Sequence, residues 1–192
     1  MRYASIIDDY NKCVGVVAGL RGKGCELVTD SLVRALVVGE DHRNALHYGV
    51  DPLAIVRAFK VRLIEGRRQG ASTVEQQLVR VVTGRFEKTP RRKLREQIIA
   101  VMLNSDFDKG ELARSYLKVA YYGCSFVGAK GIERLRSGER PASDAAIVAH
   151  LKYPRSSSCN DSMAVKHSVR VSHINRLLTD KKFTYCLGDY GI

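Results

Sequence analysis

Three observations predict that this chain folds as an all-α protein. Side-chain helix caps recur along it, and two of them are followed by proline, which suits the first position of a helix. Apolar residues between the caps recur at spacings of three and four. The alternation that marks strands is nearly absent. With 192 residues, the chain is long enough for one domain with its own core.

The first predicted helices lie before residue 65. A short apolar helix is expected over residues 32–38. Asp51 and Pro52 fit the cap and first residue of a helix that runs to about Ile64. One face of that helix is apolar, and it consists of Leu53, Val56, Phe59 and Leu63.

Two helices follow in the middle of the chain. Ser72 and Glu75 fit a capping box, and Gly84 is placed to close the helix that they open. Thr89 and Pro90 repeat the cap-then-proline signal. The apolar positions of this second helix are Leu94, Ile98, Ile99 and Met102.

Three more caps predict the remaining helices. Asp108 begins one that runs to Gly123, Ser143 one that runs to Leu151, and Ser162 one that passes Leu177. The serine run after Pro154 indicates a surface loop, and residues 1–30 and 180–192 carry the least signal.

Charge and cysteine content narrow the functional classes. A formal charge of +12 and a pI near 9.7 imply a polyanionic partner, such as nucleic acid, an acidic membrane or a phosphate-bearing substrate. The five cysteines form no CxxC pair or zinc-spaced cluster, which argues against a structural metal or disulfide framework. The apolar run 14–20 is too short to span a bilayer, and Asp8 and Asp9 stand where a signal peptide would be basic.

The first segment that suggests chemistry is E-D-H-R-N-A-L-H-Y-G, residues 40–49, in a predicted loop between helices. The carboxylates of Glu40 and Asp41 are flanked by His42, Arg43 and His47, which can tune the pKa of a catalytic base. The alternative is a helix cap with surface salt bridges.

Two further segments suggest the binding of a phosphate group. G-A-S-T-V-E-Q-Q, residues 70–77, offers free amides at a helix N-terminus, although a plain capping box also explains it. Basic residues crowd positions 80–95, and Arg92 and Lys93 lie one turn before Glu96. Glu96 is thus predicted to be held among cations, as part of a phosphate clamp or a simple helix salt bridge.

Taken together, these segments resemble glycosyltransferase family 51, the peptidoglycan glycosyltransferases. The family patterns E-D-x-x-F-x-x-H-x-G, G-x-S-T-x-x-Q-Q and R-K-x-x-E are similar to residues 40–49, 70–77 and 92–96, in that order. Weaker similarity covers residues 109–123, 131–133 and 145–154, and an echo of R-R-x-x-V-L begins at Arg170. The resemblance implies a lysozyme-like helical lobe with a smaller membrane-facing jaw at about residues 50–70. The expected domains are an extension (1–29), a catalytic domain (30–178) and a tail (179–192).

The resemblance also implies an activity and the residues that carry it. The family polymerises a lipid-linked disaccharide-peptide into glycan strands, with inversion and loss of polyprenyl pyrophosphate. Glu40 and Glu96 are the expected catalytic residues, Glu40 as general base and Glu96 as organiser of the pyrophosphate site. A divalent cation, Mg²⁺ or Mn²⁺, is expected by resemblance alone, with Glu96 as its candidate ligand. The expected substrate-binding residues are Asp41, His47, Gly70, Ser72, Thr73, Gln77, Arg80, Arg92 and Lys93.

Departures from the family patterns keep alternatives open. Asn44 stands in place of a phenylalanine, Arg80 of a lysine, and Arg114 and Lys118 of a glutamate and an asparagine. A non-catalytic homologue that binds precursor or a cell-wall partner is therefore the second hypothesis, and a nucleic-acid-binding protein, supported by charge alone, is the third. The expected partners are the precursor, the growing strand and an anionic membrane, without nucleic acid. The resemblance implies the outer face of the inner membrane, but without an evident anchor or signal peptide a cytoplasmic or peripheral location stays open.

Overall fold

The computed structural model describes residues 5–24, 26–67, 70–156 and 161–180. Within these residues the protein is all-α, as predicted, with one small β-hairpin. The elements are α1 (Ile6–Leu20), α2 (Asp30–Glu40), the 3-10 turn η1 (Asn44–Leu46), α3 (Pro52–Glu65), α4 (Val74–Thr83), α5 (Pro90–Asp106), α6 (Lys109–Val119), β1 (Tyr121–Gly123), β2 (Phe126–Val127), α7 (Gly128–Ser137), α8 (Asp144–Lys152) and α9 (Asp161–Thr179).

Four of the predicted helix starts are confirmed by cap hydrogen bonds. Asp51 accepts the amide of Ala54 before α3, and Thr89 accepts that of Arg92 before α5. Asp108 and Ser143 cap α6 and α8 in the same way. Gly84 closes α4 in a left-handed conformation. These signals succeed because they depend on a few adjacent residues.

Three local predictions are wrong. The cap of α4 is Thr73 rather than Ser72, so the capping box does not form. The helix that Asp108 opens ends at Val119, because Tyr121–Gly123 pairs with Phe126–Val127 and the Tyr122 carbonyl accepts the distant amide of Arg155. Ser162 lies inside α9, which begins at Asp161; the serines 157 and 158 lie outside the described residues.

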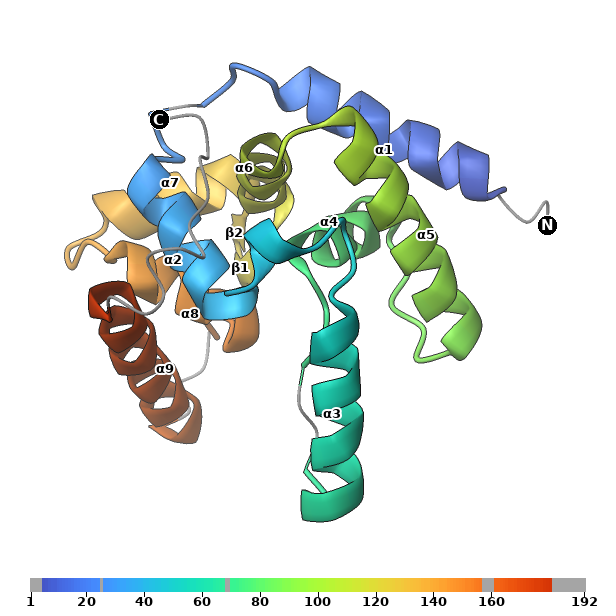
Figure 1. Cartoon of the computed structure of the whole chain (residues 1–192). Helices are drawn as coiled ribbons and strands as arrows, with labels where there is room; N and C mark the ends of the chain where they lie inside the picture. The colour runs from blue at the N-terminus through green and yellow to red at the C-terminus, as the bar shows by residue number, and fades with distance from the viewer. Residues whose placement is uncertain (1–4, 25, 68–69, 157–160, 181–192) are drawn as a thin grey trace.

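The core forms around α2, whose apolar residues are almost fully buried and which lies among α6, α8 and α9 (Figure 1 shows this arrangement of the helices). On one side α2 packs against α8 and α9, and on the other it contacts α6. The helix α4 packs against α5 and α6, and α1 lies across α4 and α5. Two segments that carry the predicted chemistry, the end of α2 and the start of α4, therefore meet beside the core.

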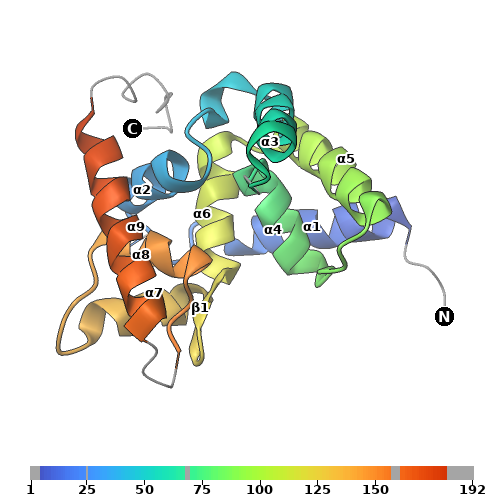
Figure 2. The same cartoon turned by 90° about the horizontal axis from the view of Figure 1, so that it is seen from below.

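The helix α3 projects away from this lobe (Figure 1), and the view from below looks nearly along its axis (Figure 2). Its predicted apolar face is present but exposed: Phe59 is 64% and Leu63 69% accessible, and only Ala54 of this helix is buried. This projecting arm matches the position of the expected jaw. No helix within the described residues is both long and apolar enough to cross a membrane.

The cysteines described by the structure, Cys13 and Cys124, carry free thiols, and Cys25, Cys159 and Cys186 lie outside the described residues. Burial raises the pKa of the Cys13 thiol to about 12, which keeps it protonated and unreactive.

Candidate active site

Glu40 is the last residue of α2, and its carboxylate is held from two sides. The side-chain amide of Gln77 donates to Oε2 at 3.3 Å, and Arg170 of α9 donates to Oε1 at 3.0 Å. Arg170 also donates to the Gly39 carbonyl. Gln77, expected as a substrate-binding residue, thus contacts Glu40, whereas Arg170 was missing from the expected site because its weak motif lies 130 residues away.

A small pocket of about 30 Å³ lies beside Glu40. It is bounded by the loop after α2, the start of α3 and residues 70–73, and it brings together the predicted residues Glu40, Asp41, Gly70, Ser72 and Thr73. Three basic side chains also line it, those of His42, Arg43 and Arg57. Arg57 was missed, since the charged residues of α3 (Arg57, Lys60, Arg62 and Glu65) form no recognisable motif. The pocket therefore combines the carboxylates of Glu40, Asp41 and Asp51 with two guanidinium groups, one of which pairs with Asp51 at 2.9 Å.

The buried carboxylate of Asp41 joins the two motifs. It accepts the Val74 amide at 3.1 Å and the Asn44 side-chain amide at 3.1 Å, and it contacts Nε2 of His47. Burial by itself raises the pKa of Asp41, but the His47 contact and the Asn44 and Val74 hydrogen bonds outweigh it, so the net shift is downward. Asp41 and His47 thus anchor the loop, and Asp41 also borders the pocket beside Glu40.

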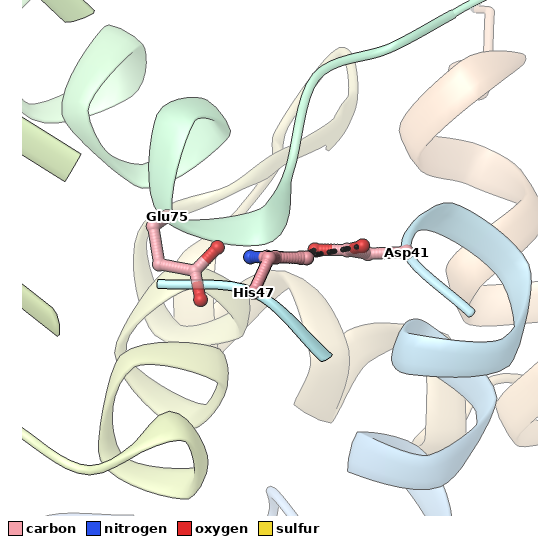
Figure 3. A group of neighbouring side chains, drawn as sticks. All are labelled: Asp41, His47 and Glu75. Atoms are coloured by element: carbon pink, nitrogen blue, oxygen red, sulfur yellow. Dashed lines mark hydrogen bonds and ion pairs between the residues drawn. The ribbon is translucent and has the colours of Figure 1, made fainter. Parts of the chain in front are cut away.

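His47 lies between Asp41 and Glu75, with one ring nitrogen directed towards each (Figure 3). The ligand atoms of these three residues lie within 4.8 Å of one another, so the group can hold a metal ion. The ammonium of Lys109 already contacts the Glu75 carboxylate and lies 3.4 Å from Nδ1 of His47. The charge of Glu75 is thus already balanced by a protein cation.

The second motif positions its residues through backbone contacts. The Thr73 hydroxyl caps α4 and donates to the Gly49 carbonyl at 2.7 Å, which also accepts from Gln76. Gly49 must be glycine, because φ is +79° and a Cβ would lie 2.4 Å from the Ala100 carbonyl oxygen. Both hydrogen bonds of the Thr73 hydroxyl therefore hold the backbone in place. Of the two hydroxyl groups in this motif, that of Ser72 contacts the basic cluster.

The predicted cation cluster forms around Glu96, which is 3% exposed. Arg80 donates to Oε1 at 2.8 Å, Lys93 reaches the same oxygen at 3.4 Å, and Arg92 pairs with Oε2. Arg80 and Lys93 also donate to the Ser72 hydroxyl, at 3.3 and 2.9 Å. Ser72 therefore connects this cluster to the pocket beside Glu40.

The pKa of Lys93 is shifted by its position in the cluster. Burial lowers the pKa of its ammonium, and the positive charges of Arg80 and Arg92 lower it further, although Glu96 opposes them. An additional anion near Lys93 would offset the unfavourable burial of the ammonium and its repulsion by Arg80 and Arg92. The arrangement is suited to binding a negatively charged group.

Comparison with known proteins agrees with this geometry. The sequence profile of the Transglycosylase family matches residues 23–135, which is more than half of the chain. The chain belongs to the transglycosylase family. Penicillin-binding protein 1A of Haemophilus influenzae is 34% identical over 80% of the chain and 19% of its own length. Biosynthetic peptidoglycan transglycosylase of Chromobacterium violaceum is 36% identical over 67% of the chain and 59% of its own length. The chain thus spans less than two thirds of these relatives.

Three residues that depart from the family patterns, Asn44, Arg114 and Lys118, each form hydrogen bonds or ion pairs within the lobe. Arg114 pairs with Asp30 at the start of α2, and Lys118 donates to the Leu20 carbonyl at 3.1 Å. Asn44, in place of the family's phenylalanine, donates to Glu75 as well as to Asp41. None of these contacts removes Glu40 or Glu96 from its position.

Proposed function

We propose that this chain is a peptidoglycan glycosyltransferase that extends glycan strands from a lipid-linked disaccharide-peptide. One observation carries the proposal: the Glu40 carboxylate borders a pocket whose Ser72 hydroxyl is held by the cations around Glu96. A candidate base and a candidate site for a pyrophosphate leaving group are thus adjacent. Family membership supports the same reaction.

In the proposed reaction, Glu40 removes the proton from the acceptor sugar's 4-hydroxyl as that oxygen attacks the anomeric carbon of the donor. The bond to pyrophosphate breaks on the opposite face, which inverts the configuration. Arg80, Arg92 and Lys93 stabilise the charge that develops on the leaving group. Gln77 and Arg170 fix the Glu40 carboxylate in place through their hydrogen bonds.

Glu96 has a different proposed role. Both of its oxygens are engaged by cations, so it is poorly placed to exchange protons with a substrate. It holds the three basic side chains at one point and limits their mutual repulsion. We therefore assign Glu96 the organisation of the pyrophosphate site.

The expected Mg²⁺ or Mn²⁺ fits poorly at Glu96, because one carboxylate among three cations is a weak donor set. The group Asp41, His47 and Glu75 offers better donors, and its mixed nitrogen and oxygen ligands suit Mn²⁺ or Zn²⁺ more than Mg²⁺. The Lys109 ammonium contacts Glu75 in that group. No step of the proposed reaction requires a metal there.

The deciding experiment incubates the purified chain with labelled lipid-linked disaccharide, with and without Mn²⁺, and measures product length. Glu40→Gln is the control, because it keeps the size of the side chain and removes the proton acceptor. We expect polymer from the unmodified chain and a rate about 10²- to 10⁴-fold lower from the variant. Precursor binding without polymer from the unmodified chain would instead support the non-catalytic homologue.

We also propose that the chain works at the outer face of the inner membrane, with α3 against the lipid. The exposed apolar face of α3 and the charge of +12 suit an anionic bilayer surface. Phe59→Ser with Leu63→Ser should weaken sedimentation with anionic vesicles. The matched control, Val165→Ser with Val169→Ser, removes two similarly exposed residues from α9 and should have little effect. Equal effects would argue against α3 as the contact.

A further inference from the structure

A second basic pocket adjoins the proposed pyrophosphate clamp, with which it shares Arg92, and lies where the N-terminus of α5 meets the start of α1. Its volume is about 380 Å³, within the usual range for ligand pockets. It shares no residue with the pocket beside Glu40. Its lining residues are Ser5, Arg85, Glu87, Thr89, Arg91, Arg92 and Arg95.

The arginines of this pocket are held in place by carboxylates behind them. Asp9, which is buried, accepts from Nε of Arg85 at 2.8 Å and from Nε of Arg95 at 2.6 Å. Arg92 is fixed through its pair with Glu96. The guanidinium groups of Arg85, Arg92 and Arg95 are thus ordered before any ligand arrives, which lowers the entropic cost of binding.

The electrostatics of the pocket favour an anion. Four arginines line it against one carboxylate, that of Glu87. The N-terminus of the 17-residue helix α5 adds the positive end of its dipole. The Nε–H of Arg92 is buried and has no hydrogen-bond acceptor, and such a group is costly unless a water or ligand satisfies it.

We propose that this pocket binds a phosphate or pyrophosphate group of its own, beside the clamp around Lys93. Arg92 is common to both, and Arg85, Arg91 and Arg95 belong to this pocket alone. Guanidinium forks match the oxygen pairs of phosphate better than single charges do. The phosphate can belong to a soluble molecule or to a lipid headgroup; Phe86 and Leu94, each at least 60% exposed and next in sequence to Arg85 and Arg95, provide apolar surface for the second. The inference does not depend on the proposed glycosyltransferase activity.

The test measures binding of inorganic pyrophosphate by calorimetry, in the whole chain carrying Lys93→Met so that the clamp is weakened. Arg91→Glu is added because Arg91 is exposed and a glutamate is favourable in the first turn of a helix, so the variant should fold. We expect affinity to fall by about tenfold or more. The matched control, Arg140→Glu, makes the same charge change at an exposed loop position and should alter affinity by less than about twofold.

A second arm distinguishes the two sources of phosphate with the same variants. Vesicles of phosphatidylglycerol are compared with vesicles of phosphatidylcholine by co-sedimentation. An Arg91-dependent preference for the anionic vesicles identifies a lipid headgroup, whereas an Arg91 effect confined to pyrophosphate identifies a soluble ligand. The proposal is overturned if Arg91→Glu and Arg140→Glu behave alike in both assays, or if Lys93→Met alone abolishes all binding.

Discussion

The two glutamates of the candidate site lie in opposite environments. Glu40 ends a helix at the edge of a pocket, and its described partners are one guanidinium and one amide. Glu96 is buried in the first half of α5 and is surrounded by three basic side chains. One carboxylate is accessible to a substrate, and the other is enclosed by the protein's own charges.

The difference separates a chemical role from a structural one. A buried carboxylate with several cationic partners is costly to remove, because each partner then keeps its desolvation penalty without compensation. Glu40 should cost less to remove, because only one cation, Arg170, then loses its counter-charge, although this pair is itself partly buried. The same Glu→Gln substitution should therefore lower mainly the stability at Glu96 and mainly the activity at Glu40.

The largest expected effect on stability is at Glu96. Glu96→Gln leaves Arg80, Arg92 and Lys93 without their shared counter-charge, and we expect a loss of about 3–5 kcal/mol in the free energy of unfolding. Urea denaturation measures this loss. Glu40→Gln is the matched substitution and is expected to cost about 1–2 kcal/mol, because one partly buried cation rather than three loses its partner. Similar losses at both positions would remove the distinction drawn between them.

The same contrast shows what the sequence could predict. The helix starts at Asp51 and Thr89 were predictable, because a cap and its amide partner lie three residues apart. The Arg92 and Glu96 pair was predictable from helical spacing. Contacts that set the environment of Glu40 were not, since Arg170 is 130 residues away and no local pattern links the two.

Burial was also hard to predict from local patterns. The apolar spacing of α3 correctly indicated a helix, but not that Phe59 and Leu63 would stay exposed, because that depends on which element packs against them. Glu75 was assigned to a cap, yet it is 1% exposed and pairs with Lys109 of α6. Sequence therefore predicted the elements well and the partners of their polar residues poorly.

The next effect extends the comparison to Glu75, a third carboxylate with a single cationic partner. Lys109→Met leaves the buried Glu75 with only the Asn44 hydrogen bond described here, and we expect a loss of about 2–4 kcal/mol. Adding Glu75→Gln should recover part of it, since the unpaired charge is then gone. Additive losses in this double-mutant cycle, measured by urea denaturation, would show that the two residues do not interact energetically.

A smaller effect should appear as pH dependence at Asp41. Its pKa is lowered in the folded state, so its contribution to stability is complete well above the unfolded value of about 3.9 and is lost as pH falls through the lowered value. Asp41→Asn should therefore be less stable than the unmodified chain at pH 7, and the difference should shrink towards pH 3. A difference that stays constant over this range would contradict the lowered pKa.

The smallest expected effect concerns the hydrogen bonds from Tyr116 through Gln77 that orient the Glu40 carboxylate. The Tyr116 hydroxyl donates to Oε1 of Gln77 at 2.7 Å, and Gln77 in turn donates to Glu40. Tyr116→Phe should cost about 1 kcal/mol in stability and lower the polymerisation kcat about three- to tenfold, because Gln77 loses its fixed orientation.

Tyr122→Phe is the matched control for the Tyr116→Phe variant. It also removes a buried hydroxyl, one that donates to the Leu117 carbonyl at 2.8 Å, but that bond has no contact with Gln77. We expect a similar loss of stability with kcat unchanged. Equal losses of kcat in the two variants would mean that Tyr116 acts through packing alone, and that the position of Glu40 does not depend on the hydrogen bonds behind it.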